Sequence, residues 1–340
     1  MYNIALNFLK KNIKNDNNLL NFEYLRGKLY DQKTDLLKNS SIKVHDADRA
    51  IALVCQNYKS ALTNLKKKHI KHFRIRYWSK NKKKKIVDLE KQNFSKNGIR
   101  FAILGKITGY YNGDSYDFSK VTKDCRLIRE DNEYWLYVPQ NVVKEDDPPN
   151  LDNVSATDLG VTKVGTTITE NKVIIIGEEC AQKIRTQLER LDKITNNEKI
   201  SDKIKRKNEK QINRKIKNWV DELHWKVIKY LVSTSQNILI GNLSSKSISR
   251  KGGNISKMTK RIAQRLRFYV LKERLKYKSS VHKRGYGEIN EWMTSKMCSV
   301  CGNIDYDLGG NKIYKCAKCN TKMDRDVNGA RNIYIKGIKK

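Results

Sequence analysis

Four cysteines near the carboxyl end of the chain are spaced like metal ligands. Cys298 and Cys301 form one C-x-x-C pair, Cys316 and Cys319 form a second, and fourteen residues separate the pairs. Two such tight turns can direct four sulfurs at one Zn²⁺, at about 2.3 Å each. Because sulfur would fill all four positions, such a zinc would be structural. The spacing therefore predicts one structural zinc site, in a zinc ribbon over residues 294–323.

The alternative for these cysteines is a pair of disulfides in a secreted protein. Residues 1–14 contain no apolar run followed by a small-residue cleavage site, and charges interrupt each apolar run before it reaches membrane-spanning length. We therefore expect an intracellular protein with reduced thiols. The other cysteines are scattered singly and are expected to be core or incidental residues: Cys55, Cys125 and Cys180.

Two distant segments carry aspartates that could bind catalytic metal ions. Asp158 ends an apolar stretch in A-T-D-L-G, and Asp326 lies in D-R-D-V-N, which begins at Asp324. Aspartates that converge on one sheet can hold two Mg²⁺ about 3.5–4 Å apart for hydrolysis of a phosphodiester. Either aspartate alone would be weak support, since D-x-G turns are common. Together with the cysteines and the charge, they predict a two-metal nuclease.

The composition indicates a polyanionic partner. Lysine and arginine total 71 against 36 acidic residues, which gives a formal net charge of +35 over 340 residues. A chain of this charge is expected to bind phosphate backbones with strong salt dependence. An anionic membrane surface is the alternative, but the sequence shows no lipidation motif and no compact basic amphipathic helix. Because the charge is spread along the whole chain, we expect nucleic acid and no membrane.

Candidate nucleic-acid contacts come from the lysine-rich first half and from a basic helix expected at 257–278. A lysine run can also be a solvated face, and a single aromatic residue more often belongs to a core. The candidate phosphate contacts are Arg74, Arg76, Lys82, Lys83, Lys84, Lys85, Lys260, Arg261 and Arg265. The candidate base-stacking residues are Tyr77 and Trp78.

The elements that must position these residues fall into two predicted domains. Residues 1–148 are expected to form a recognition region, helical over 2–70 and β-rich over 71–143, with strands at 72–78 and 133–138. An acidic, proline-bearing linker is expected at 145–149. Residues 149–340 alternate strands with helices, as an α/β layer requires. The expected strands there are 154–158, 172–177, 237–240 and 287–292, and the long helices span 180–232 and 257–278. One apolar stripe is expected along Ile212, Ile216, Trp219, Leu223 and Val227.

Three segments of the chain resemble the TnpB family of transposon-encoded RNA-guided nucleases and their eukaryotic and giant-virus relatives, the Fanzor proteins. T-D-L-G-V at 157–161 resembles the first RuvC motif of the family, T-S-K-M-C-S-V-C-G at 294–302 resembles its T-S-x-x-C-x-x-C-G segment, and D-R-D-V-N-G-A-R-N-I at 324–333 resembles its third RuvC motif. The resemblance implies an RNase H-like (RuvC) nuclease domain with an inserted zinc ribbon, preceded by a helical and β-barrel region. It also implies a guide RNA from the transposon end and cleavage of matching double-stranded DNA.

The second RuvC motif departs from the family pattern. A glutamate usually follows its strand, where this chain has I-G-N-L at 240–243. Glu291, fifty residues after Gly241, resembles the relocated glutamate of Fanzor proteins and of a subset of TnpB. The resemblance thus implies Asp158, Glu291 and Asp326 as Mg²⁺ ligands, with Asp324 in support. Glu288 is the competing donor, on the opposite strand face, and is expected to be a solvated surface acid.

The start of the chain also departs from the family, because M-Y-N-I-A-L stands where a β-strand usually precedes the first helix. We therefore expect the first strand of the family's wedge-like barrel to be missing. Other functions stay open, namely a nuclease-inactive RNA-guided repressor, a zinc-ribbon DNA-binding regulator, and a transposase or its accessory factor. The host decides between cytoplasm, for a prokaryote, and nucleus, for a eukaryotic or giant-virus origin. The oligomeric state stays unknown.

Overall fold

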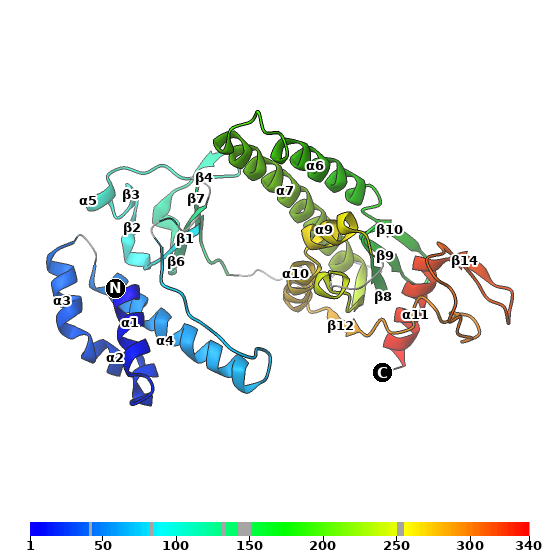
Figure 1. Cartoon of the computed structure of the whole chain (residues 1–340), viewed down its shortest axis with the longest axis horizontal. Helices are drawn as coiled ribbons and strands as arrows, with labels where there is room; N and C mark the ends of the chain where they lie inside the picture. Colours follow the sequence, from blue (N-terminus) through cyan, green and yellow to red (C-terminus); the bar gives the residue numbers. More distant parts are fainter. Residues whose placement is uncertain are drawn as a thin grey trace. The chain divides into compact units, whose positions relative to one another are not determined.

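The computed structural model describes residues 1–340 except 41–42, 80, 82–83, 131–132, 142–150, 250–254 and 340. The chain forms two compact units, Met1–Asn141 and Val142–Lys340 (Figure 1). The domain boundary predicted at 148 and the linker predicted at 145–149 lie outside the described residues, as do Lys82 and Lys83. In the described parts of the chain, no helix is both long enough and apolar enough to span a membrane.

The first unit begins with a group of helices that share one apolar core. These are α1 (Tyr2–Asn12), α2 (Phe22–Lys28), α3 (Tyr30–Lys38) and α4 (Val44–Lys66). Asn21 caps α2, because its side chain accepts hydrogen bonds from the backbone amides of Glu23 and Tyr24. Leucines of α1 and α2 pack on one face of α4, which carries the buried Ile51. Cys55 lies in this core, as expected.

The strands of the first unit form an open sheet and two small hairpins. The sheet has the antiparallel order β1 (Lys84–Leu89), β6 (Cys125–Glu130) and β7 (Glu133–Tyr137). β2 (Phe94–Ser95) pairs with β3 (Gly98–Ile99), and β4 (Tyr110–Tyr111) pairs with β5 (Asp114–Ser115); α5 (Phe101–Leu104) lies between the hairpins. The expected β-barrel does not form among the described residues, since three strands are too few to close.

The strand predicted at 72–78 is wrong. This segment is extended, but its end is held by a side chain of α1 instead of a neighbouring strand. Asn3 donates a hydrogen bond to the Trp78 carbonyl at 2.9 Å and accepts one from the Trp78 amide at 2.7 Å. The alternation of apolar and polar residues therefore reflects packing against helices, with Phe73 and Ile75 turned toward the core of α1 and α4.

The second unit is built on a five-stranded sheet with the order β10-β9-β8-β11-β12. Its strands are β8 (Asp152–Leu159), β9 (Gly165–Ile168), β10 (Val173–Ile176), β11 (Ser235–Gly241) and β12 (Gly285–Ile289). β8, β11 and β12 run parallel, whereas β9 and β10 continue the sheet antiparallel. The carboxyl ends of the three parallel strands therefore meet at one edge, beside each other.

Helices cover both faces of this sheet. Ile238 and Ile240 of β11 face the core made with α6 (Cys180–Thr195), α7 (Asp202–Thr234), α9 (Lys257–Leu266) and α10 (Phe268–Val281). Leu239 points to the other face, toward the core around Ile333 of α11 (Arg325–Ile338). α6 and α7 lie side by side (Figure 1).

The helices predicted across 180–232 are confirmed as α6 and α7. The single helix predicted over 257–278 needs correction, because it is broken at Arg267, which adopts a left-handed φ of 53°. The buried stripe of α7 includes Ile212, Ile216 and Val227, but its centre is Val220 and His224, while Trp219 and Leu223 are only half-buried. A period of 3.6 residues shifts the stripe by one position over this length.

Candidate active site and metal centre

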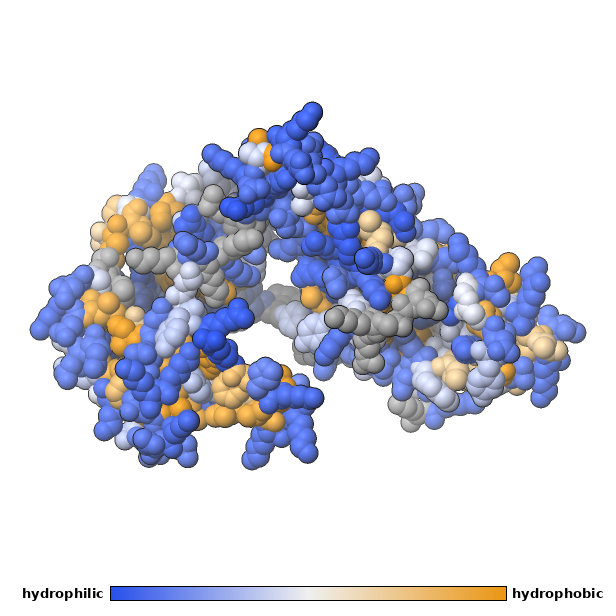
Figure 2. Space-filling view, in the orientation of Figure 1, coloured by the Kyte–Doolittle hydropathy of each residue, from blue (hydrophilic) through white to orange (hydrophobic). Residues whose placement is uncertain are grey.

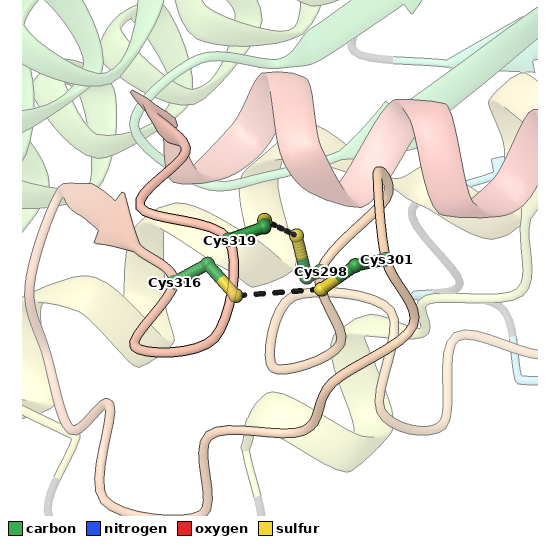
Figure 3. A group of neighbouring side chains, drawn as sticks. All are labelled: Cys298, Cys301, Cys316 and Cys319. Atoms are coloured by element: carbon green, nitrogen blue, oxygen red, sulfur yellow. Dashed lines mark hydrogen bonds between the residues drawn. The ribbon is translucent and has the colours of Figure 1, made fainter.

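The four predicted cysteines meet at one point of the second unit. Their sulfur atoms all lie within 4.8 Å of one another, in a group that could hold a metal ion. Figure 3 shows the two C-x-x-C turns facing each other, with Cys298 Sγ 3.7 Å from Cys319 Sγ and Cys301 Sγ 3.6 Å from Cys316 Sγ. Four sulfurs around Zn²⁺ at about 2.3 Å would lie about 3.8 Å apart. These spacings suit a tetrahedral zinc site.

Hydrogen bonds favour the thiolate at the second C-x-x-C turn and lower the pKa of both Cys316 and Cys319, whereas burial and the neighbouring sulfurs raise the pKa of Cys301. The Thr321 hydroxyl lies 3.1 Å from Cys319 Sγ, and hydrogen bonds from the side chain and backbone of Thr321 lower the pKa of Cys319 to about 6. The second turn connects the two strands of a hairpin, β13 (Ile313–Lys315) and β14 (Lys322–Asp324), and buried Tyr314 packs beside the cysteines. The metal would thus organise a module with a very small core of its own.

Asp158 and Gly241 occupy matching positions at the carboxyl ends of β8 and β11. Thr157 pairs with Ile240, so the next residue of each strand turns to the face covered by α11. The packing there is close, because a Cβ atom on Gly329 of α11 would overlap Asp158 Oδ2. A glutamate at position 241 would therefore stand next to Asp158.

Glu291 fills the space beside Gly241. A Cβ atom on Gly241 would overlap Glu291 Oε1 and would lie only 2.7 Å from Glu291 Cδ. Glu291 is not part of the predicted strand at 287–292, because β12 ends at Ile289 and the side chain reaches back from the following turn. Its Oε1 accepts a hydrogen bond from the Leu243 amide at 3.1 Å. The carboxylate thus lies where a side chain at position 241 would begin.

Asp324 and Asp326 stand at the start of α11. Asp324 caps this helix, since its Oδ1 accepts from the amides of Asp326 and Val327, and its Oδ2 accepts from Lys163 Nζ at 2.8 Å. Lys163 Nζ also lies 3.5 Å from Asp326 Oδ2. Lys163 comes from the loop between β8 and β9, and sequence analysis missed it because it is one lysine among many.

The acids interact electrostatically. Burial raises the pKa of Asp158 well above its ordinary value, and repulsion from Glu291 and Asp326 raises it further. Burial also raises the pKa of Glu291. Among the described residues, the four cysteines are the only group of three or more possible ligand side chains gathered at such spacing. A bound cation would relieve both the burial cost and the repulsion.

Glu288 is an exposed acid, as expected, but its carboxylate also makes contacts within the chain. Its Oε2 accepts a hydrogen bond from Lys272 Nζ at 2.8 Å, and its Oε1 accepts one from the Tyr286 hydroxyl at 2.9 Å. Burial alone would raise the pKa of Glu288, but these two hydrogen bonds lower it. It lies next to Ile240 on the face that α10 covers, away from Asp158. The period-2 argument placed it on the correct face.

The predicted nucleic-acid contacts differ in exposure. Arg74, Arg76, Lys84 and Lys85 are exposed, whereas Lys260 and Arg265 are half-buried. Several of the candidates also make contacts within the chain, and Lys84 Nζ lies 3.8 Å from a carboxylate oxygen of Glu130. Arg261 forms a two-pronged ion pair with Asp192 of α6, at 2.6 and 2.8 Å, Trp78 stacks on Tyr2 with ring centres 4.4 Å apart, and the Tyr77 hydroxyl donates to Asn7. Hydrophilic residues cover most of the α6–α7 hairpin in the view of Figure 2.

Comparisons with known proteins find relatives of this chain. Residues 268–333 match the family Cas12f1-like, TNB domain. The chain is 33% identical over 313 residues to a TnpB-like protein of Acanthamoeba polyphaga mimivirus, which covers 88% of this chain and 59% of that protein. It is 30% identical over 131 residues to the CRISPR-associated endodeoxyribonuclease Cas12f1 of Sulfoacidibacillus thermotolerans, over 38% of this chain and 30% of that one. A TnpB-like protein of Methanocaldococcus jannaschii is 30% identical over 140 residues, 39% of this chain and 48% of its own.

The second unit is thus an α/β domain that carries a four-cysteine metal module between a sheet edge rich in acids and its last helix. The chain is similar along most of its length to TnpB-like proteins, and its residues 268–333 are similar to the Cas12f1-like TNB domain. The matched part of the chain covers 59% of the length of the mimivirus relative.

Proposed function

We propose that this chain is an RNA-guided DNA endonuclease encoded by a transposable element, with an RNase H-like (RuvC) nuclease domain in its second unit. The similarity to TnpB-like proteins, the mixed five-stranded sheet and the net charge of +35 support this function. Its partners would be a guide RNA from the transposon end and double-stranded DNA that matches the guide. It would act inside the cell that carries the element, in nucleus or cytoplasm according to the host.

In this proposal Asp158, Glu291 and Asp326 hold two Mg²⁺ ions. Bound there, the ions would activate water and stabilise the leaving oxygen of the phosphodiester. The chain's own part is to present the acids from β8, from the turn after β12 and from the first turn of α11. Asp324 and Lys163 support the three ligands without binding the ions. Asp324 caps the start of α11, and Lys163 holds Asp324 to the β8–β9 loop.

One observation carries the preference for an active nuclease over a silent DNA-binding repressor. The position that has lost its glutamate is filled by the carboxylate of Glu291, which stands over Gly241 with no room for another side chain. A decayed site would have no reason to keep this space free for a buried acid whose burial raises its pKa. A plain zinc-ribbon regulator or a transposase accessory factor leaves these acids unexplained.

We also propose that Zn²⁺ occupies the four-cysteine group and is structural. The sulfur spacing and the lowered pKa of Cys319 support it. Because Glu291 precedes Cys298 by seven residues and Asp326 follows Cys319 by seven, the module lies between two of the proposed magnesium ligands in the chain.

The test is a plasmid-cleavage assay on the chain purified with its co-expressed element-end RNA, in the presence of Mg²⁺. We expect the wild type to cut guide-matched plasmid and Glu291→Ala to lose about 1,000-fold or more of the rate. The double variant Gly241→Glu with Glu291→Ala, which returns the acid to β11, is expected to regain part of the activity. Glu288→Gln serves as the matched control, because Glu288 faces α10 and should affect the rate little.

Two results would contradict the proposal in different ways. If the wild type binds the RNA and matched DNA but cuts nothing over a range of Mg²⁺ concentrations, the repressor function is favoured. If Glu291→Ala cuts as fast as the wild type while Asp158→Ala does not, the nuclease stands but its third acid lies elsewhere.

A further inference from the structure

The last motif of the chain contains two buried asparagines to which the proposed metal chemistry gives no role. Asn328 and Asn332 lie four residues apart on α11, and both are 0% exposed. Residues at this spacing share one face of a helix. A buried amide is costly unless its polar atoms are hydrogen-bonded, so the partners of these two side chains show what this face of α11 holds.

The partners are all backbone atoms of one short segment. Asn328 Nδ2 donates to the Met297 carbonyl at 2.8 Å, and Asn328 Oδ1 accepts from the Ser299 amide at 3.0 Å. Asn332 Nδ2 donates to the carbonyls of Thr294 and Met297, at 2.8 and 2.6 Å.

One turn further along the same helix face, Lys336 Nζ donates to the Trp292 carbonyl at 2.6 Å. Asn328, Asn332 and Lys336 therefore form a continuous row, which we call the α11 clamp. The clamp holds residues 292–299 against the last helix by their main chain, independently of the side chains of that segment.

The clamped segment joins the two candidate metal sites. It begins directly after Glu291, whose carbonyl accepts from both the amide and the hydroxyl of Thr294, at 3.1 and 2.9 Å. It ends at Ser299, inside the first C-x-x-C turn, where the Ser299 amide is held by Asn328. The clamp residues also follow Asp326 on the same helix, within three turns. The position of Glu291 relative to Asp326 is thus fixed by α11 on one side and by the cysteine module on the other.

We propose that Asn328 and Asn332 are positioning residues that couple the four-cysteine site to the proposed magnesium-binding acids. They fasten the segment from Glu291 to Cys298 onto the helix that carries Asp326, so that a closed cysteine site holds the Glu291 carboxylate over Gly241. This inference rests on the proposed nuclease function, because the positioned acids serve catalysis only in a nuclease. The effect of the clamp on metal binding exists whether or not DNA is cut.

The chemistry of the amide explains why asparagine stands at these positions. Asn328 uses its donor and its acceptor at once, which a carboxylate of the same shape cannot do. In Asn332 the amide nitrogen serves two carbonyls, and its oxygen has no hydrogen-bond partner among the described residues. Removing Asn332 leaves two buried carbonyls without this donor, which loosens the segment next to Glu291.

The experiment measures Mn²⁺ binding by titration calorimetry on the full zinc-loaded chain without nucleic acid, for wild type, Asn328→Ala, Asn332→Ala and the control Arg331→Ala. Arg331 is exposed on the same helix. We expect about 10-fold to 100-fold weaker Mn²⁺ binding in both asparagine variants, as for other residues that orient metal ligands. Zinc content and guide RNA affinity should match the wild type. In cleavage, kcat at low Mg²⁺ should fall and recover at high Mg²⁺, with KM for DNA unchanged.

Mn²⁺ affinity within twofold of the wild type in both asparagine variants would overturn the proposal. So would an equal loss in Arg331→Ala. If an alanine variant fails to fold, Lys336→Met and Asn328→Asp are measured in its place. Mn²⁺ affinity equal to that of the wild type in both of these variants would also overturn the proposal. If the wild type binds Mn²⁺ through Asp158 and Glu291 but cuts no DNA, the proposed nuclease function fails, and the clamp is still judged by the binding data.

Discussion

The four cysteines come from two short turns, whereas the three acids come from β8, from the turn after β12 and from α11. Each C-x-x-C turn brings two sulfurs together locally, and the four sulfurs lie within 4.8 Å of one another. The acids repel one another, and Lys163 lies between two of the neighbouring carboxylates. Local geometry preorganises the first site, while the second depends on tertiary packing and on the cation that it would bind.

The largest expected effect comes from breaking the locally built site. Cys316→Ser removes one sulfur, and we expect loss of zinc and unfolding of the module, because structural zinc supplies about 10 kcal/mol or more to such folds at neutral pH. Zinc content by mass spectrometry and thermal unfolding measure this effect. Cys180→Ser, outside the four-cysteine group, is the control. A Cys316→Ser protein that keeps its zinc and melting temperature would show that the module folds by its apolar contacts.

Removing an acid is expected to separate activity from stability. Asp158→Asn should reduce cleavage by about 1,000-fold or more, yet raise the melting temperature of the metal-free protein, because the pKa of Asp158 is raised by burial and by repulsion. A raised carboxyl pKa means that the folded state binds the extra proton. The stability of the metal-free wild type therefore falls as pH rises above the ordinary aspartate range, and the advantage of Asp158→Asn grows with it.

Calorimetry from pH 4 to 8, with and without Mn²⁺, tests this expectation. Asp152→Asn, at the opposite end of the same strand, is the control. A lower melting temperature for Asp158→Asn at every pH would show that the carboxylate is well compensated without an ion, and the contrast between the two sites would fail.

His224 is a buried residue that belongs to neither candidate metal site, so its effect on the pH dependence of stability should not depend on metal. His224 Nε2 donates to the Leu266 carbonyl at 2.9 Å, and burial first, then nearby Arg274, lowers the pKa of His224 to about 4. The unfolded chain binds this proton more readily, so stability is complete above the ordinary histidine pKa and is lost as pH falls toward 4. We expect a loss of about 2 kcal/mol between pH 7 and 5. Urea unfolding should show this slope, unchanged by Mn²⁺ and reduced in His224→Gln.

The smallest effect is expected at the lysine between the acids. Lys163→Met keeps the aliphatic stem but removes the contacts with Asp324 and Asp326. Without metal, we expect a loss of about 1 kcal/mol or less, since Asp324 and Asp326 are partly exposed. With Mn²⁺ the difference should narrow, because the ion takes over the neutralisation. Thermal unfolding with and without Mn²⁺ measures it, and a larger difference with the ion present would contradict it.

The difference between a site built from local turns and a site built from distant segments also explains what could be predicted from the sequence. The cysteine group follows from spacing alone, and the strand ends that carry Asp158 and Gly241 follow from short apolar runs. The lysine at position 163 and the buried asparagines gave no signal, because their roles depend on contacts with segments distant in sequence. The predicted strand at 72–78 failed because its alternating pattern packs against helices. β9 was missed because its sequence G-T-T-I lacks the continuous apolar run V-I-I-I that marks β10, a strand of the same length.

Gly241 and Glu291 also constrain how this protein can change. A single substitution that restores glutamate at 241 would put its Cβ into the Glu291 carboxylate, and a single loss of Glu291 would leave the sheet edge one acid short. Neither step alone gives an intact set of three, so the two arrangements of the acid are separated by a defective intermediate. Once the glutamate is at position 291, the glycine at position 241 must therefore be kept.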